Sequence, residues 1–222
     1  MPDAPRTALV LGATGLVGGH VLDLLLADAA WTRVLTLGRR PAARDDPKLE
    51  QRVVGFDRVE EHADAFAVDA VFCCLGTTIR AAGSQEEFRR VDHDYSVAAA
   101  RLASGRGAPH FLLVTAMGAD AGSRVFYNRV KGEVERDVTA LPFAGVTIAR
   151  PSLILGERAG RRTAEGIAQK LAPVLNPLLF GPLRRYRAIP AASIARALVK
   201  LARQGPAGVR VVESDELDAL GA

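Results

Sequence analysis

Residues 7–19 read Thr-Ala-Leu-Val-Leu-Gly-Ala-Thr-Gly-Leu-Val-Gly-Gly, and this stretch decides the fold. Residues 7–11 are a short apolar run that is typical of a strand. Glycines follow at positions 12, 15 and 18, and apolar residues then recur at helical spacing over 16–27. A strand, a glycine turn and a helix N-terminus form a phosphate cradle, because glycine lets the backbone approach an anion and the first helical amides point at it.

The glycine spacing is a variant of the usual dinucleotide fingerprint, whose first two glycines lie closer together. Its position after the first apolar strand and before a helix favours a nucleotide site over an ordinary surface turn. The residues of this turn that we expect to contact a cofactor are Gly12, Thr14, Gly15, Leu16, Val17 and Gly18.

Length and composition indicate one globular α/β domain. The chain has 222 residues, of which 49% are apolar and 24% charged, a balance that excludes intrinsic disorder. We expect residues 1–222 to form a single domain, with 156–222 completing the substrate side. The formal net charge is +4 with the arginines spread along the chain, which is not the pattern of a nucleic-acid-binding protein.

Cysteine and histidine usage bounds the redox and metal chemistry. Cys73 and Cys74 are adjacent, and we interpret them as buried, reduced strand residues. The four histidines have no ligand spacing, so no metal site is expected. No apolar run is long enough to span a bilayer, and the N-terminus is better explained as strand, turn and helix than as a signal peptide. The expected location is cytoplasmic, with no membrane partner.

Strands and helices alternate along the chain, which predicts a doubly wound parallel sheet with right-handed crossovers. Strands are expected at 7–11, 34–37, 52–55, 70–75, 111–115, 146–149 and 209–212, and helices at 16–27, 85–104, 125–141, 163–175 and 194–203. Ligands of such sheets lie beyond the carboxyl ends of the strands, so the functional residues should directly follow strands.

The residues at the end of the second predicted strand indicate which dinucleotide the chain prefers. An NAD site usually carries an acidic residue there, whereas this chain has Gly38 followed by Arg39 and Arg40. A guanidinium pairs well with a 2′-phosphate, so we expect NADP(H) in preference to NAD(H), with Arg39 the better candidate; the alternative is two solvated turn residues. Asp57, after the third strand, is a candidate acceptor for the adenine amino group or a helix N-cap.

The candidate catalytic pair is Tyr127 and Lys131, which lie one helical turn apart on one face. An ammonium beside a tyrosine favours the phenolate and lowers its pKa, so the pair suits a general acid for a carbonyl that receives hydride. The ammonium can also bind the nicotinamide ribose. Thr115, at the end of the fifth strand, is a candidate for hydrogen bonding the substrate oxygen, or an ordinary strand residue.

Together these motifs resemble the extended and atypical branches of the short-chain dehydrogenase/reductase superfamily. Cys-Cys-Leu-Gly-Thr-Thr at 73–78, Val-Asp-His-Asp-Tyr at 91–95 and Met-Gly-Ala-Asp at 117–120 are similar to the HIV Tat-interacting-protein-like oxidoreductases, as is the Tyr127-x-x-x-Lys131-Gly-Glu-Val-Glu run. The likeness covers residues 7–155 well and is loose afterwards.

The resemblance implies a Rossmann-type fold, NADP(H) binding, Tyr127 as acid and base, Lys131 tuning it, and Thr115 holding the substrate. It also implies that Leu75, Gly76 and Thr77 line the cofactor. Two departures stand out: the superfamily's active-site serine is Thr115 here, or Ala116 with a shift of one residue, and the asparagine of the fourth helix is Asp92.

Two functional readings follow. The first is an NADP(H)-dependent oxidoreductase that acts on a small-molecule carbonyl or alcohol, as a monomer or homodimer; the same residues also support epimerase or dehydratase chemistry. The second is an NADP(H)-binding regulator with little turnover. The substrate side lies in 156–190, where Arg158, Arg161 and Arg162 are a candidate anion lid or a solvated loop.

Overall fold

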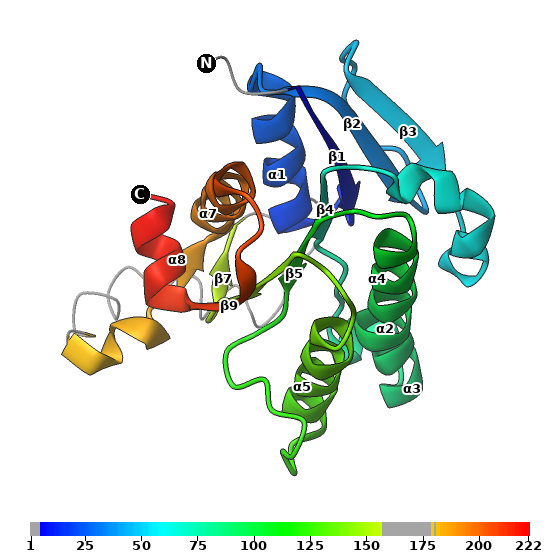
Figure 1. Ribbon diagram of the computed structural model, residues 1–222. Helices are drawn as coiled ribbons and strands as arrows, with labels where there is room; N and C mark the ends of the chain where they lie inside the picture. The colour runs from blue at the N-terminus through cyan, green and yellow to red at the C-terminus, as the bar shows by residue number, and fades with distance from the viewer. Residues whose placement is uncertain (1–4, 157–178, 180) are drawn as a thin grey trace.

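The computed structural model describes residues 5–156, 179 and 181–222, and seven of its strands form one parallel sheet in the order β3-β2-β1-β4-β5-β6-β9 (Figure 1). The strands are β1 (Arg6–Leu11), β2 (Trp31–Gly38), β3 (Leu49–Val53), β4 (Ala70–Cys73), β5 (His110–Val114), β6 (Gly145–Arg150) and β9 (Gly208–Glu213). A separate short pair joins β7 (Ile154–Leu155) to β8 (Ile189–Pro190). The predicted doubly wound, Rossmann-type α/β fold is confirmed.

Helices cover both faces of the sheet. On one face lie α1 (Leu16–Ala27) and α7 (Ala191–Gln204), with α8 (Ser214–Leu220) beside α7 (Figure 1). On the other lie the 3-10 segment η1 (Phe56–Phe66), α4 (Tyr95–Gly105) and α5 (Phe126–Thr139). The remaining helical segments are α2 (Ile79–Ala82), α3 (Gln85–Arg89), the π-helical turn η2 (Arg90–Asp94) and the 3-10 segment η4 (Gly181–Tyr186).

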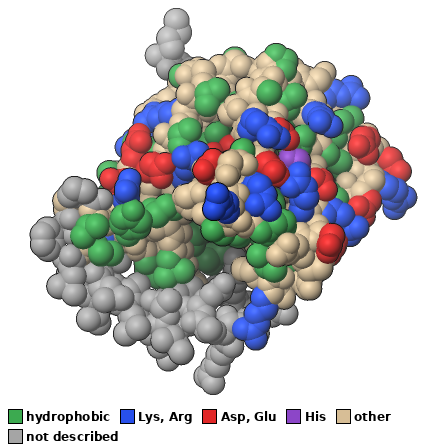
Figure 2. Space-filling model, turned by 90° about the horizontal axis from the view of Figure 1, so that it is seen from below, with side chains coloured by type: hydrophobic (Ala, Val, Ile, Leu, Met, Phe, Trp, Pro, Cys, Tyr) green, Lys and Arg blue, Asp and Glu red, His purple; other side chains and the backbone are tan. Residues whose placement is uncertain are grey.

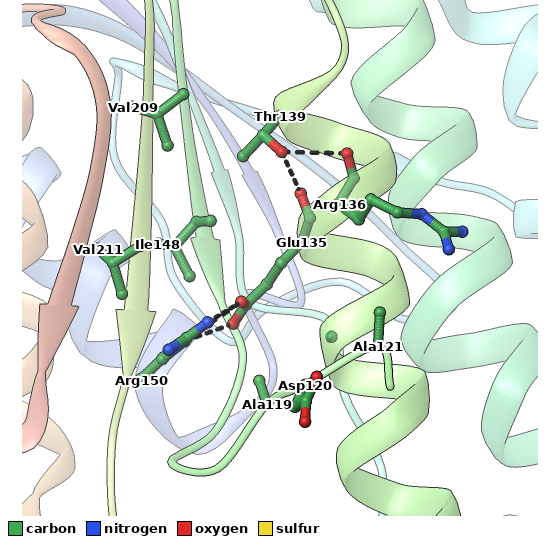
Figure 3. A pocket seen from close by; sticks show the side chains of 11 residues that line it. Ala119, Asp120, Ala121, Glu135, Arg136, Thr139, Ile148, Arg150, Val209 and Val211 are labelled. Carbon is green, nitrogen blue, oxygen red and sulfur yellow. Dashed lines mark hydrogen bonds and ion pairs between the residues drawn. The ribbon is translucent and has the colours of Figure 1, made fainter. Parts of the chain in front are cut away.

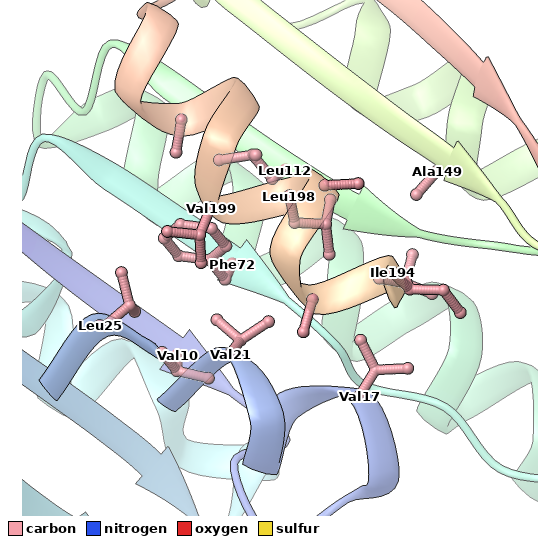
Figure 4. Close-up of a cluster of buried hydrophobic side chains, with 14 of the residues drawn as sticks. Val10, Val17, Val21, Leu25, Phe72, Leu112, Ala149, Ile194, Leu198 and Val199 are labelled. Carbon is pink, nitrogen blue, oxygen red and sulfur yellow. The ribbon is translucent and has the colours of Figure 1, made fainter. Parts of the chain in front are cut away.

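Side-chain alternation along the strands divides the core into two layers. In β1, Ala8 and Val10 pack toward α1 and α7, whereas Leu9 and Leu11 pack toward α4 and η1. Both layers consist of buried apolar side chains, so the central strands are continuous apolar runs. Figure 4 shows the first layer, where Val17, Val21 and Leu25 of α1 meet side chains of α7 over the sheet.

Several predicted boundaries move. The helix at 16–27 is confirmed, but β3 begins at Leu49, three residues before the predicted strand at 52–55. The single helix predicted at 85–104 is instead α3, a π-helical turn and α4 in succession. The predicted helix at 163–175 and the arginine loop at 158–162 lie outside the described residues. No described helix has the length and apolar character needed to cross a membrane.

A titratable group is buried within the sheet itself. His110 at the start of β5 is 2% exposed, and its Nε2 lies 2.9 Å from Thr147 Oγ1 on β6. Burial lowers the pKa of His110 to about 4. Because the unfolded chain binds this proton at higher pH than the folded chain does, the group makes stability depend on pH.

We expect the free energy of unfolding to fall as the pH is lowered from about 6.5 to about 4, since the folded state resists protonation of His110. The contribution of this group is at most about 3 kcal/mol. Urea unfolding of the wild type and His110→Gln across this range measures it: the wild type should lose more stability on acidification than the variant. Parallel curves would contradict the assignment.

Candidate active site

The predicted cofactor residues converge at one edge because all the strands of the main sheet are parallel. Gly12 follows β1, Arg39 follows β2 and Leu75 lies two residues beyond β4. β1 and β4 are direct neighbours in the sheet although two strands separate them in the sequence. This is the topological switch point, where open α/β sheets bind their ligands. Figure 2 shows the molecule from below the view of Figure 1. On this face basic and acidic side chains are interspersed, and hydrophobic side chains gather beside them.

The glycine turn is built from close backbone contacts. Gly12 has φ +79°, and a Cβ there would lie 2.5 Å from the Cys74 carbonyl oxygen. A Cβ at Gly18 would overlap the Gly12 carbonyl group. Only glycine therefore fits at these two positions, and the turn brings β1, the end of β4 and α1 together.

The N-terminus of α1 fits a phosphate group. Its N-cap, Gly15, supplies no side-chain hydrogen bond, and the first turn contains no acidic residue. Thr14 and Gly15 are exposed, but the Gly15 amide donates to the Gly12 carbonyl at 2.8 Å, so the amides that follow it in the first turn are the ones available to an anion. Leu16 is partly buried, and Val17 points into the core, so the latter can meet a cofactor only through its backbone.

Arg39 and Arg40 are both exposed immediately after β2, and neither has a hydrogen bond or ion pair to another described residue. Their guanidinium groups are therefore available for a 2′-phosphate, and their assignment to the cofactor stays a prediction.

Asp57 lies in the first turn of η1, and its Oδ1 accepts a hydrogen bond of 2.7 Å from the Tyr95 hydroxyl. The N-cap of η1 is Gly55, so the alternative of Asp57 as an N-cap is wrong. The adenine contact stays a prediction.

The loop after β4 is tied to the helix that follows. The Thr77 amide donates to Asp92 Oδ2 at 2.9 Å, and Asp92 belongs to the π-helical turn η2. Gly76 is exposed, and a Cβ there would lie 3.5 Å from Asp92 Oδ1 and 3.9 Å from Lys131 Nζ. Gly76 therefore places the exposed backbone of this loop next to the buried Asp92 and Lys131 side chains.

The predicted pair of Tyr127 and Lys131 lies on α5, and the structure adds a partner. Lys131 Nζ lies 2.6 Å from Asp92 Oδ1, and the two side chains are 6% and 0% exposed. Burial is the largest single effect and disfavours the ammonium, but the charge and hydrogen bonding of Asp92, together with Tyr127 and Cys73, outweigh it and raise the pKa of Lys131. Tyr127 is partly buried, with its ring 5.3 Å from that of Phe88. Lys131 is thus held as a cation beside a phenol.

Thr115 has a different partner from the predicted one. It is 5% exposed, and its hydroxyl donates to Glu135 Oε1 at 2.6 Å. Glu135 lies two turns beyond Tyr127 on α5 and is also bound by Arg150 of β6. The hydroxyl is therefore engaged within the protein, a geometry that counts against its predicted role in holding the substrate.

A groove of about 350 Å³ opens beside this buried network. It lies between α5 and the edge formed by β6 and β9, with Glu135 and Arg150 paired at its base and Val209 and Val211 on one wall (Figure 3). It includes none of the predicted cofactor residues. The described residues contain no group of three or more His, Cys, Asp or Glu side chains suited to a metal ion.

Sequence reasoning missed Asp92 and Glu135 as partners of predicted site residues. Residues 127, 131 and 135 share one helical stripe, and both Lys131 and Glu135 on it are buried. Charged residues on the stripe that faces a sheet are the signal for buried ion pairs. The stripe does not reveal the partners, because Asp92 and Arg150 come from other elements.

Comparison with known proteins fits this geometry. Residues 12–205 match a protein family described as NAD(P)H-binding. The chain belongs to this NAD(P)H-binding family. It is 34% identical to Protein HTATIP2 of Rattus norvegicus, over 97% of this chain and 89% of that protein. The resemblance to Tat-interacting-protein-like oxidoreductases is confirmed.

Two further relatives bear on location and fold. The chain is 35% identical to a protein named fmp52, mitochondrial, of Emericella nidulans, over 90% of both chains. Relatives named as mitochondrial overturn the cytoplasmic expectation. The solved structure of MoeE5 in complex with UDP-glucose and NAD superposes with a TM-score of 0.70 at 17% identity, covering 97% of this chain and 81% of that one, which shows a shared fold.

Replacing the Thr115 hydroxyl tests what it does. We expect Thr115→Val to destabilise the protein by about 1–2 kcal/mol, because Glu135 loses a buried donor, and to leave NADPH affinity unchanged. Urea unfolding and a fluorescence titration with NADPH measure the two effects. Full stability combined with lost turnover on an identified substrate would restore the substrate role.

Proposed function

We propose that this protein is an NADP(H)-dependent oxidoreductase of the short-chain dehydrogenase/reductase type that interconverts a small-molecule carbonyl and its alcohol. The observation that carries the proposal is the placement of Tyr127 on α5 one helical turn before the buried cation Lys131, beside the loop after β4. A phenol, an ammonium and a phosphate cradle at one edge are the groups that hydride transfer to a carbonyl needs.

The chain's own residues would divide the work as follows. The amides that begin α1 would bind the diphosphate, and Arg39 or Arg40 the 2′-phosphate. The loop 75–77 would lie along the cofactor, and Lys131 would hydrogen-bond the ribose. When bound, NADPH would provide the hydride that the carbonyl carbon accepts. Tyr127 donates its hydroxyl proton to the carbonyl oxygen as that oxygen gains charge, and takes the proton back in the oxidative direction.

One observation favours the second hypothesis, that the protein is an NADP(H)-binding regulator with little turnover. The Thr115 hydroxyl donates its hydrogen bond to Glu135. Among the described residues, Tyr127 is then the side chain that we assign as hydrogen-bond donor to a substrate oxygen. A retained Tyr127 and a buried, charged Lys131 favour the enzyme. The same residues also support epimerase or dehydratase chemistry, in which the hydride returns to the substrate.

Removing the Tyr127 hydroxyl separates catalysis from binding. We expect Tyr127→Phe to lower kcat about 100- to 1,000-fold, because general acid catalysis is lost, and to change NADPH affinity less than about twofold. The decrease in NADPH absorbance with a panel of aldehydes and ketones provides the rate. A variant that retains full turnover would contradict the acid/base assignment, and NADPH binding without turnover on any substrate would support the regulator.

A further inference from the structure

The ion pair between Asp92 and Lys131 is almost completely buried, although it lies beside the predicted cofactor loop. The Asp92 side chain is 0% exposed, and both its oxygens are used, Oδ1 by Lys131 Nζ at 2.6 Å and Oδ2 by the Thr77 amide at 2.9 Å. One carboxylate therefore joins the predicted catalytic helix α5 to the predicted cofactor loop after β4.

The π-helical turn explains how Asp92 reaches this position. Residues 85–105 would otherwise form one continuous α-helix, but η2 widens the helix at Arg90–Asp94. Such widened turns re-aim side chains and concentrate at functional sites. Within this turn Asp92 is buried, whereas Asp94 is 54% exposed and pairs with His93.

The charged and titratable groups around Lys131 are few. Asp92 faces it from η2, Tyr127 from its own helix, and Cys73 from β4. Burial raises the pKa of the Cys73 thiol, so this group is neutral. Asp92 therefore makes the largest contribution to keeping this buried ammonium charged, and without it desolvation would favour the neutral amine.

We propose that Asp92 is a positioning residue that holds Lys131 protonated and in place beside Gly76 of the predicted cofactor loop, so that cofactor binding does not depend on the titration of Lys131. The inference rests on the proposed function, because it assigns Lys131 to the cofactor ribose. It also accounts for the departure at this position, since an asparagine would keep the bond to the Thr77 amide but supply no charge.

The test compares NADPH binding by the wild type, Asp92→Asn and the matched control Asp94→Asn between about pH 6.5 and pH 8.5. Asp92→Asn should bind NADPH about tenfold more weakly at the upper pH relative to the wild type, because without the Asp92 charge desolvation lowers the pKa of Lys131. Asp94→Asn removes the same charge from an exposed position in the same π-helical turn. Its NADPH affinity should change with pH as that of the wild type does. The cofactor's own phosphate also titrates in this range, but it changes NADPH binding equally in all three proteins and so cancels in the comparison.

Thermal unfolding of the cofactor-free proteins provides a second readout. In Asp92→Asn the unfolded chain would carry a proton on residue 131 that the folded chain lacks, so stability rises with pH. Its deficit in Tm against the wild type should therefore shrink as the pH rises from about 6.5 to about 9. Adding Lys131→Met to Asp92→Asn should remove this pH dependence, because no buried cation remains.

The two proposals fail in different ways. If the wild type does not bind NADPH, the proposed function fails while the stability readout still tests the ion pair. If NADPH binds but Asp92→Asn follows the wild type in both pH profiles, Asp92 does not hold the charge of Lys131 and the inference is overturned.

Discussion

The backbone contact among Gly12, Gly18 and the Cys74 carbonyl is the constraint on which the rest of this structure depends. It brings the ends of β1 and β4 and the start of α1 closer together than any side chain permits. The same contact leaves the amides that begin α1 without a side-chain cap. The same glycines therefore serve both packing and anion binding. A larger side chain at either position would fill the space that the anion needs, even if it added apolar contacts.

Buried charge is the second constraint, and it is concentrated on α5. Lys131 and Glu135 face the interior one turn apart, and each has a counter-charge from another element, Asp92 of η2 and Arg150 of β6. Removing one member of such a pair leaves an uncompensated buried charge, which is strongly destabilising. The two pairs fix the position of α5 and keep the charge states of its inward side chains defined.

The sequence predicted what depends on local pattern and on strand direction. The glycine turn, α1 and the parallel sheet followed from residues 7–27 and from the alternation of elements, and the sheet then placed Arg39, Gly76 and Lys131 at one edge. Contacts between distant elements were not predictable. The hydroxyl of Thr115 was available to a substrate as far as the sequence showed, whereas Glu135, which binds it, is set by the packing of α5 on β5. The π-helical turn was missed because helical periodicity does not reveal one inserted residue.

Titration of the wild-type protein with NADPH and with NADH determines whether the carboxyl edge of this sheet holds NADP(H). Reduced-nicotinamide fluorescence reports the binding of each cofactor. We expect one site per chain, with NADPH bound at least about tenfold more tightly than NADH, because Arg39 and Arg40 are exposed after β2 and have no partner among the described residues. Equal affinities would contradict the preference for NADP(H), and no binding of either cofactor would contradict the site itself.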